Sequence, residues 1–168
     1  VLANGLDYRV NGNHVRNFDL AGIDVNSTAS NVTIDGNEVQ LNSEDGIKAN
    51  GVQCTISNNN VHNNGDAGIQ FNSDHTLVTG NQVYDNSQIT TSQYGIVHDI
   101  GADFCIVTNN KVYDTQGGSA TQNGYRVVGA ADRCLIQGNI FYANKTTNIT
   151  GTGSLTNSVY AAGDNIVA

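Results

Sequence analysis

Gly36-Asn37-Glu38-Val39 is the stretch that decides the fold, because its pattern recurs five more times with the asparagine in the same place. The intervals between the asparagines are 24, 22, 22, 29 and 29 residues, and the asparagines are Asn13, Asn37, Asn59, Asn81, Asn110 and Asn139. A repeat of this length cannot enclose a hydrophobic core alone, so consecutive copies must stack on one another.

Apolar residues keep fixed positions around this asparagine. Three residues before it stand Val10, Ile34, Ile56, Val78, Val107 and Ile136, and two after it stand Val15, Val39, Val61, Val83, Val112 and Phe141. A second phrase begins a further strand at Gly22, Gly46, Gly68, Gly95 and Gly124. Because apolar and polar residues alternate within each short strand, one face points to a common interior. The pattern predicts an all-β fold, a single-stranded parallel β-solenoid of about six to seven rungs.

The asparagine has a structural explanation. A side-chain amide both donates and accepts hydrogen bonds, so stacked copies can bond one another along the solenoid while capping buried turns. We expect a second, shorter ladder from Asn26, Asn50 and Asn72, which Asp99 continues.

Composition limits the partners and the domain count. The chain has 168 residues, no proline and a formal net charge of −8, which argues against nucleic acid or an anionic membrane as partner. We expect one domain over residues 1–168, with regular rungs over 8–144 and a closing segment over 145–168. Residues Val1 to Asp7 are too few and too mixed to form a helix that caps the first rung, so we expect the chain to be part of a longer one.

The repeat resembles the right-handed parallel β-helix of the pectate-lyase-like superfamily, whose rungs carry the same asparagine turn and Gly-Ile strand start. The resemblance covers roughly Tyr8 to Asn144. It implies a right-handed solenoid and a polysaccharide partner, because the superfamily contains lyases, hydrolases, epimerases and phage tailspikes. The trimeric tailspikes among them make a homotrimer plausible, and an extracellular or virion-surface location follows from the same likeness.

The repeat lengthens at one phase. From the ladder asparagine to the next Gly-Ile glycine the offset is nine residues in the first three rungs and 14 in the last two. The extra residues fall within 87–93 and 116–122. Insertions at one phase project from one face, commonly the binding face. We interpret them as walls of a saccharide groove over the Gly-Ile strand, while tolerated surface insertions remain the alternative.

The candidate catalytic residues are Tyr94, His98, Asp99 and Arg126. The substrate-binding candidates, in or beside successive copies of the Gly-Ile strand, are Lys48, Gln70 and Asn123. Uronate chemistry needs a cation to neutralise the carboxylate and a base for the adjacent proton. Arg126 or Lys48 fits the first role, and Tyr94 or His98 the second. The alternation places His98 in an inward column, where a buried neutral imidazole is the alternative interpretation. Lys48 and Asp24 also fit as partners on a solvated face.

One segment is similar to the catalytic Tyr-Gly-Phe-Asp-Pro-His-Glu stretch of mannuronan C5-epimerases. In Tyr94-Gly95-Ile96-Val97-His98-Asp99, the residues Tyr94, Gly95 and His98 match. Val97 stands where that stretch has an acid and a proline, and Asp99 replaces its glutamate. The signatures of pectate lyases and polygalacturonases are absent from the sequence.

Tyrosines and cysteines form two further columns. Tyr84, Tyr113 and Tyr142 share an outward phase, where they can stack on sugar rings or only on one another. Cys54, Cys105 and Cys134 share an inward phase typical of small hydrophobic residues. Spacing predicts no zinc site and no cofactor, and Ca²⁺ binding by Asp and Asn oxygens has no motif behind it.

Two functional hypotheses follow. The first is an extracellular glycan-directed module of a polysaccharide lyase, hydrolase, epimerase or tailspike, with its groove over the Gly-Ile strand. The second is a structural rod without catalysis, such as part of a phage fibre or a surface adhesin. The inserted loops favour the first hypothesis, and Val97 in place of an acid favours the second.

Overall fold

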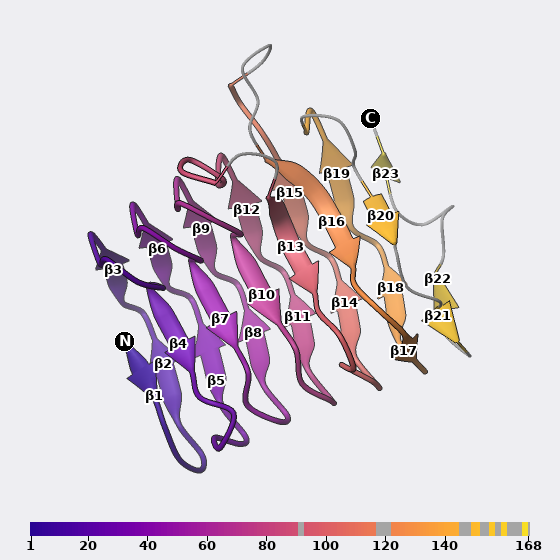
Figure 1. Ribbon diagram of the computed structural model, residues 1–168, viewed down its shortest axis with the longest axis horizontal. Coiled ribbons are helices and arrows are strands. Elements are labelled where there is room, and N and C mark those ends of the chain that lie inside the picture. Colours follow the sequence, from indigo (N-terminus) through magenta and orange to yellow (C-terminus); the bar gives the residue numbers. More distant parts are fainter. Residues whose placement is uncertain are drawn as a thin grey trace.

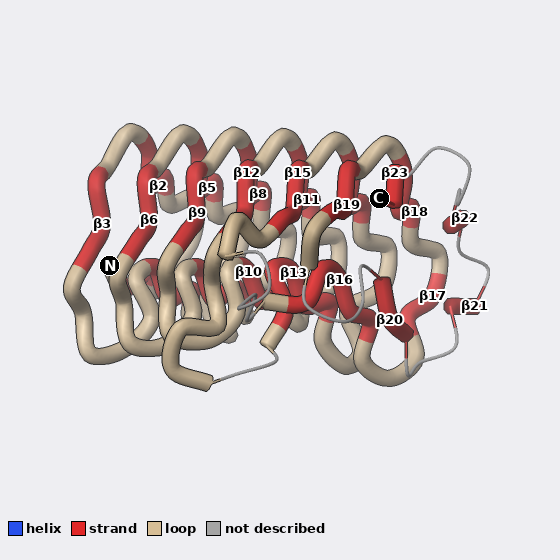
Figure 2. Tube along the Cα trace, turned by 90° about the horizontal axis from the view of Figure 1, so that it is seen from above, coloured by secondary structure: helices blue, strands red, loops and turns tan. Residues whose placement is uncertain are grey.

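The computed structural model describes residues 1–90, 93–116, 122–144 and 149–151, and the backbone of 155–156, 159–160 and 166–167. Parts of both insertions, residues 91–92 and 117–121, lie outside the described residues, as does much of the expected closing segment. The described chain consists of short strands joined by turns, which coil into a rod (Figures 1 and 2).

Three parallel sheets of seven strands run along the rod. The Gly-Ile sheet contains β1 (Leu2–Ala3), β4 (Ile23–Val25), β7 (Ile47–Ala49), β10 (Ile69–Phe71), β13 (Tyr94–His98), β16 (Asn123–Val127) and β20 (Ile149–Gly151). The upstream sheet, before the ladder asparagine, contains β2 (Arg9–Asn11), β5 (Thr33–Asp35), β8 (Thr55–Ser57), β11 (Leu77–Thr79), β14 (Ile106–Thr108), β18 (Leu135–Gln137) and β22 (Val159–Tyr160).

The downstream sheet, after the asparagine, contains β3 (His14–Arg16), β6 (Glu38–Gln40), β9 (Asn60–His62), β12 (Gln82–Tyr84), β15 (Lys111–Tyr113), β19 (Ile140–Tyr142) and β23 (Ile166–Val167). Two further strands, β17 (Ala131–Asp132) and β21 (Leu155–Thr156), form a small parallel sheet near the C-terminal end. Each rung therefore visits all three sheets once. The expected fold, a right-handed parallel β-helix of about six to seven rungs, is confirmed.

The register places equivalent residues of successive rungs directly above one another. In the Gly-Ile sheet Ile47 pairs with Ile69 and Ile69 with Ile96, while in the downstream sheet Val61 pairs with Val83. All these side chains are fully buried. One continuous core therefore fills the rod, and each inward column is a stack of nearly identical side chains.

The asparagine ladder forms as the repeat predicts. Each ladder amide donates its Nδ2 to the Oδ1 of the next asparagine, at 3.1, 3.0, 3.0, 2.9 and 2.9 Å along the series. Each Oδ1 also accepts the backbone N–H of the preceding ladder residue, for example Asn59 N to Asn81 Oδ1 at 3.0 Å. A stacked amide thus replaces the strand hydrogen bonds that the turn interrupts.

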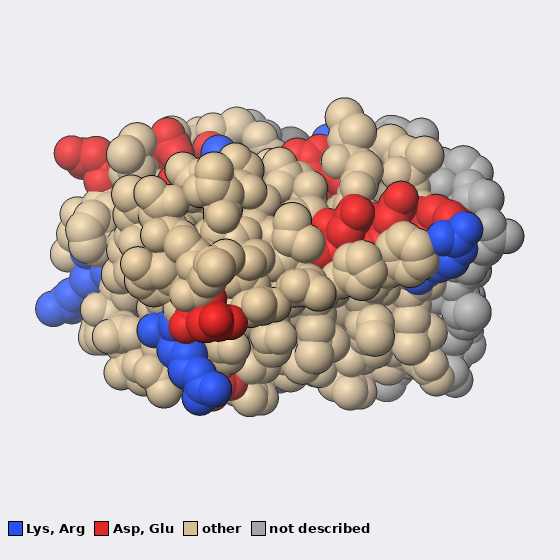
Figure 3. Space-filling view, turned by 90° about the horizontal axis from the view of Figure 1, so that it is seen from below, with Lys and Arg blue, Asp and Glu red and all other residues tan. Residues whose placement is uncertain are grey.

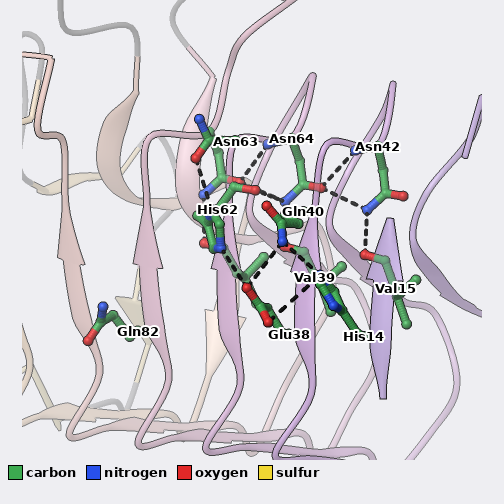
Figure 4. A network of polar contacts seen from close by, with 12 residues as sticks. His14, Val15, Glu38, Val39, Gln40, Asn42, His62, Asn63, Asn64 and Gln82 are labelled. Carbon is green, nitrogen blue, oxygen red and sulfur yellow. Dashed lines mark hydrogen bonds and ion pairs between the residues drawn. The ribbon is translucent and has the colours of Figure 1, made fainter. Parts of the chain in front are cut away.

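The expected second ladder is wrong in its position. Asn26, Asn50, Asn72 and Asp99 do stack in register, but Asn26 Oδ1 accepts Thr28 N and Asp99 Oδ2 accepts Gln70 Nε2. The second ladder instead follows the downstream sheet: Asn42 Nδ2 bonds Asn64 Oδ1 at 2.9 Å (Figure 4). Asn64 Nδ2 in turn bonds Asn86 Oδ1 at 2.9 Å. Gln122 then takes the asparagine's place, because its Oε1 accepts Asn86 Nδ2 at 3.0 Å.

Turn residues with positive φ recur in three columns. One holds the residue before the ladder asparagine, such as Gly36 (φ 64°) and Asn58 (φ 55°). A second follows the downstream sheet, and the third precedes the upstream sheet with His75 (φ 59°), Phe104 (φ 56°) and Arg133 (φ 52°). The left-handed conformation suits Gly and Asn, so phenylalanine and arginine at these positions are held there by the stacked turn.

Candidate functional site

The outward row of the Gly-Ile sheet is the surface on which the sequence places a saccharide groove. Strand register confirms the row, which runs Asp24, Lys48, Gln70, Val97, Arg126 and Thr150. Lys48, Gln70 and Arg126 are partly exposed, and Val97 is 9% exposed. The row is therefore a polar strip with cations near both ends and one apolar step between them.

Arg126 and Tyr94 form a pair on this strip. The Arg126 guanidinium carbon lies 5.4 Å from the centroid of the Tyr94 ring, so the cation covers the ring face. The Tyr94 hydroxyl accepts a hydrogen bond from Thr150 Oγ1 at 3.2 Å. Tyr94 lies on β13 and Arg126 on the neighbouring β16, which fixes both side chains on one wall of the rod. The pair presents a cation and a phenol side by side, partly open to solvent.

Gln70 and Asp99 are joined at the far edge of the strip. Gln70 Nε2 donates to Asp99 Oδ2 at 2.9 Å, and the other carboxylate oxygen of Asp99 accepts the N–H of Ile100 at 2.8 Å. Both oxygens of Asp99 are thus engaged within the protein. Two predicted site residues are thus brought together, but the Asp99 carboxylate also accepts a backbone hydrogen bond within the turn that follows β13.

His98 and Asn123 are both buried. His98 is fully buried, with Nε2 bonded to Ala102 O at 2.6 Å and Nδ1 to Tyr125 Oη at 3.0 Å. The inward column predicted by the strand alternation is therefore correct, and the imidazole does not face the strip that carries Tyr94 and Arg126. Asn123 is 3% exposed. The structure therefore does not bring His98 to the outward row with the other predicted site residues.

Asp45 is a titratable residue near the strip that the sequence analysis missed. Asp45 stands two residues before Ile47, just as Tyr94 stands two residues before Ile96. Because these isoleucines are stacked through Ile69, Asp45 and Tyr94 belong to one column, with Ala67 between them. Asp45 Oδ1 accepts Ala67 N at 3.0 Å, and burial raises the pKa of its carboxyl to about 6 although the Lys48 charge opposes the shift. The signal was available, because Asp45-Gly46-Ile47 repeats the form of Tyr94-Gly95-Ile96.

The first insertion folds back onto the preceding rungs. Gln88 N donates to Asn64 O at 3.0 Å, and Ile89 N donates to Gly65 O at 3.0 Å. With Leu41 and Gly65, Gln88 and Ile89 line a cleft of about 320 Å³ at the corner between the downstream and Gly-Ile sheets. This described part covers the corner before β10. Because both insertions include residues outside the described part of the chain, the wall they were expected to form stays a prediction.

The tyrosine column lies on a different sheet. Tyr84, Tyr113 and Tyr142 stack at 5.0 Å between consecutive ring centroids, and His62 extends the stack below Tyr84 at 4.7 Å. Lys111 Nζ lies 4.8 Å from the Tyr113 centroid. The rings face one another along the downstream sheet, so the structure does not bring Tyr84 and Tyr113 to the strip. Their role in substrate binding stays a prediction.

Acidic side chains gather on the turns before the upstream sheet. Asp74 Oδ1 accepts Asp103 N at 2.9 Å, and Asp103 Oδ1 accepts Asp132 N at 2.7 Å, so each carboxylate caps the next rung. Figure 3 looks onto these turns and shows the acidic row running toward the C-terminal end with basic atoms beside it. These three carboxylates thus lie away from the outward row of the Gly-Ile sheet.

The interior also brings together three groups that can bind a metal. One ligand atom each from His98, Cys105 and Cys134 lies within 4.8 Å of the others, and all three residues are buried. Sequence spacing alone gives no such cluster, because the residues come from two rungs and meet only when the rungs stack. Among the described residues, no helix is long and apolar enough to cross a membrane.

A solved structure of a known protein shares this architecture. The A-module of the mannuronan C-5 epimerase AlgE6 of Azotobacter vinelandii superposes with a TM-score of 0.63 at 15% identity, over 99% of this chain and 56% of that module. The chain thus spans little more than half of that module's length. An alginate lyase of Paenibacillus sp. str. FPU-7 matches with a TM-score of 0.40 at 11% identity, over 88% of this chain and 75% of the lyase. Curated proteins gave no significant sequence match.

The family comparison bears on the chain as a whole. The model of the right-handed β-helix region matches residues 1–141, which are nearly all the described rungs. Together with the three stacked sheets and the asparagine ladder, this match shows that the chain belongs to the right-handed β-helix family.

Proposed function

We propose that this chain is an extracellular glycan-directed module that binds a uronate-containing polysaccharide along the outward row of the Gly-Ile sheet. The observation that carries the proposal is the Arg126–Tyr94 pair, a cation over a phenol ring on an open wall. A guanidinium can bind a carboxylate through two parallel hydrogen bonds, which favours an acidic sugar over a neutral one. Because the AlgE6 A-module, which shares this fold, is a mannuronan C-5 epimerase, a uronate polymer is the first ligand to test.

The same pair suggests the reaction. Removing the proton next to a uronate carboxylate leaves charge on the carboxylate oxygens, and a fixed cation stabilises that charge. In the proposed chemistry Arg126 neutralises the carboxylate, and Tyr94, acting as a phenolate, takes the proton from the adjacent carbon. A proton delivered by water to the opposite face gives an epimer, whereas β-elimination, in which the abstracted proton passes from Tyr94 to the departing glycosidic oxygen, gives a lyase product.

Lys48 would extend the binding strip. It lies three strand steps from Arg126 through Gln70 and Val97, which at about 4.8 Å per step is roughly 14 Å. That span is longer than one sugar, so a glycan already bound at Arg126 can also reach Lys48 with a second carboxylate only if it is an oligosaccharide. We expect Lys48→Gln to weaken binding of longer uronate oligomers and to leave the binding of a disaccharide unchanged.

The test uses polymannuronate, polyguluronate and polygalacturonate, with neutral cellulose oligomers as comparison. Retention on immobilised polymer measures binding, deuterium uptake at C5 from D₂O measures proton exchange, and ultraviolet absorbance of unsaturated products measures cleavage. Arg126→Gln should lower retention by about tenfold or more, the usual loss when a charged hydrogen-bond partner is removed. Tyr94→Phe should keep retention and abolish deuterium uptake or cleavage.

Arg133→Gln is the matched control. Arg133 also covers an aromatic ring, with its guanidinium carbon 4.9 Å from the Phe104 centroid, but it lies on the acidic turn face. Retention equal to the unmodified protein is expected for this variant. If Arg126→Gln and Arg133→Gln behave alike, the strip does not bind the glycan.

A non-catalytic structural rod is the second candidate. Val97 at the centre of the strip and the burial of His98 favour it, because both remove polar groups that catalysis could use. Retention on a uronate polymer with neither deuterium uptake nor cleavage would limit the module to binding. No retention on any polymer, with the fold intact, would support the rod.

A further inference from the structure

The interior of the fifth and sixth rungs holds a cluster of metal-ligating side chains that the proposed function does not use. His98 ends β13, Cys105 directly precedes β14, and Cys134 directly precedes β18. Their ligand atoms lie within 4.8 Å of one another, and the three residues are 0%, 1% and 3% exposed. A nitrogen and two sulfurs are thus gathered in the buried interior.

This meeting occurs at one level of the rod only, within the described rungs. The cysteine column continues as Thr76, Cys54 and Val32 toward the N-terminus, and the column of His98 continues as Phe71, Ala49 and Val25. Cys54 lies in the rung of Ala49, and its thiol bonds Gly51 O at 2.9 Å. The same fold position therefore carries a solitary thiol at one level and a ligand triad at another.

Hydrogen bonds at both ring nitrogens fix the orientation of His98. Its Nε2–H and the Cys134 thiol both donate to the carbonyl of Ala102, at 2.6 and 3.5 Å, so this nitrogen and this sulfur converge on one point. To ligate a cation, Nε2 gives up this hydrogen bond and its proton moves to Nδ1, while the thiol releases its own proton to solvent. The opposite nitrogen, Nδ1, contacts Tyr125 Oη at 3.0 Å. Metal-bound histidines commonly engage their second nitrogen with a fixed oxygen partner, which orients the ring. Tyr125, itself fully buried, supplies that partner.

We propose that His98, Cys105 and Cys134 form an interior binding site for a thiophilic d¹⁰ cation, and that this cation is Zn²⁺. Two thiolates and one neutral imidazole balance the charge of Zn²⁺, which is the arrangement that a buried, low-dielectric site requires. Sulfur and nitrogen ligands select Zn²⁺ or Cu⁺ over Ca²⁺ and Mg²⁺. Zn–S bonds of about 2.3 Å place neighbouring ligand atoms about 3.5–3.8 Å apart, so modest side-chain rotations bring the three ligands to bonding distance and leave the fourth position of a tetrahedral site to a water or a backbone carbonyl.

The burial of the site decides how the metal enters. A site with no open path fills as the chain folds, and its binding free energy then adds to the stability of the folded state. The test therefore refolds the whole chain from denaturant under reducing conditions with Zn²⁺, with Cu⁺ or with no metal. Bound metal is measured by mass spectrometry of elements after gel filtration, and Co²⁺ replaces Zn²⁺ as a spectroscopic probe.

The expected result is one bound metal per chain, a higher thermal midpoint after refolding with metal, and sulfur-to-Co²⁺ charge-transfer bands. Cys134→Val should lose all three, and valine already occupies this column at Val32, so folding is preserved. Cys54→Val is the matched control and should retain them. His98→Gln should lose the metal while keeping both thiols. A signal with Cu⁺ alone would assign the site to that ion.

Three outcomes would overturn the proposal. One is refolded protein that holds no metal and has the same midpoint in all three refolding arms. Another is metal that Cys134→Val retains in full. The third is a mass deficit of two hydrogens in the reduced-buffer preparation that Cys105→Val removes, which would mean a Cys105–Cys134 disulfide in place of the thiolate pair.

Discussion

The asparagine ladder should carry a measurable share of the stability, and Asn81→Ala is the sharpest test. The Asn81 amide donates to Ile56 O and Asn110 Oδ1, both at 2.9 Å, and accepts from Asn59 N and Asn59 Nδ2, both at 3.0 Å. Asn81 is 1% exposed. Truncation removes four hydrogen bonds at about 1 kcal/mol each, and the freed Asn59 N–H is a buried donor whose cost is about 1–3 kcal/mol.

Some partners keep a bond, which limits the loss. Asn59 Nδ2 still donates to Ile34 O, and Asn110 Oδ1 still accepts the backbone N–H of residue 81. We therefore expect Asn81→Ala to lower the free energy of unfolding by about 4 kcal/mol. Urea titration followed by circular dichroism measures it, with the slope of the transition checked for two-state behaviour.

Asn13→Ala is the matched control at the exposed end of the same ladder. Its amide donates to Asn11 O and Asn37 Oδ1, both at 3.1 Å, and lies near solvent that can replace these bonds. We expect a loss of about 1 kcal/mol or less. Equal losses at both positions, or a loss below about 1 kcal/mol for Asn81→Ala, would refute the claim that buried amide stacking stabilises the rod.

Three further predictions concern charge, close packing and the aromatic column. The pKa of Asp45 is about 6 in the folded protein against an ordinary 3.8, so its contribution to stability is present below pH 4 and is lost as pH rises through 6. The free energy of unfolding of Asp45→Asn, relative to the unmodified protein, should therefore rise by about 2 kcal/mol between pH 4 and pH 7, as measured by urea titration at both values. At Gly68 an added Cβ would lie 2.7 Å from Gly95 O, so Gly68→Ala should lower the thermal midpoint more than Gly36→Ala, where only the φ of 64° opposes alanine. Tyr113→Leu, which interrupts rings stacked at 5.0 Å, should cost about 1–2 kcal/mol in urea and leave glycan retention unchanged; reduced retention would mean that the downstream sheet also binds.

The fold was predictable from the sequence because its signals are local and repeated. A ladder asparagine with valines at fixed offsets specifies both the strand face and the rung spacing, and the register of Val61 with Val83 confirms that spacing. The second ladder was not predictable in the same way. Asn42, Asn64 and Asn86 follow their strands at the same phase, but the next member, Gln122, directly precedes β16 and so lies at the other end of an insertion.

The candidate site was only partly predictable. Strand alternation placed Lys48, Gln70 and Arg126 on one outward row, because a period of two fixes the face of each residue. It could not supply the stacking of Arg126 on Tyr94, which depends on side-chain rotamers across two rungs. It placed His98 inward, as the structure confirms, but it did not exclude a bulge that would have turned the imidazole outward.

The three rung lengths follow from two insertion points, and this explains why the ligand triad occurs where it does. A rung of 22 residues has five positions from the last inward residue of the Gly-Ile strand to the cysteine column, as from Phe71 to Thr76. The first rung and the two long rungs have seven, as from His98 to Cys105 and from Val127 to Cys134. The two added residues convert intervals of 22 into 24, and five more before the Gly-Ile strand convert 24 into 29.

The longer turn carries an inward alanine, as at Ala29, Ala102 and Ala131, each 1% exposed or less. The carbonyl of Ala102 is the acceptor that His98 Nε2 and the Cys134 thiol share. In the short turn this residue is absent, and the Cys54 thiol bonds Gly51 O instead. Deleting two residues from the turn after His98 should therefore bring the rung back to the short form and remove the convergence of nitrogen and sulfur, while the asparagine ladder, which lies on another corner, keeps its register.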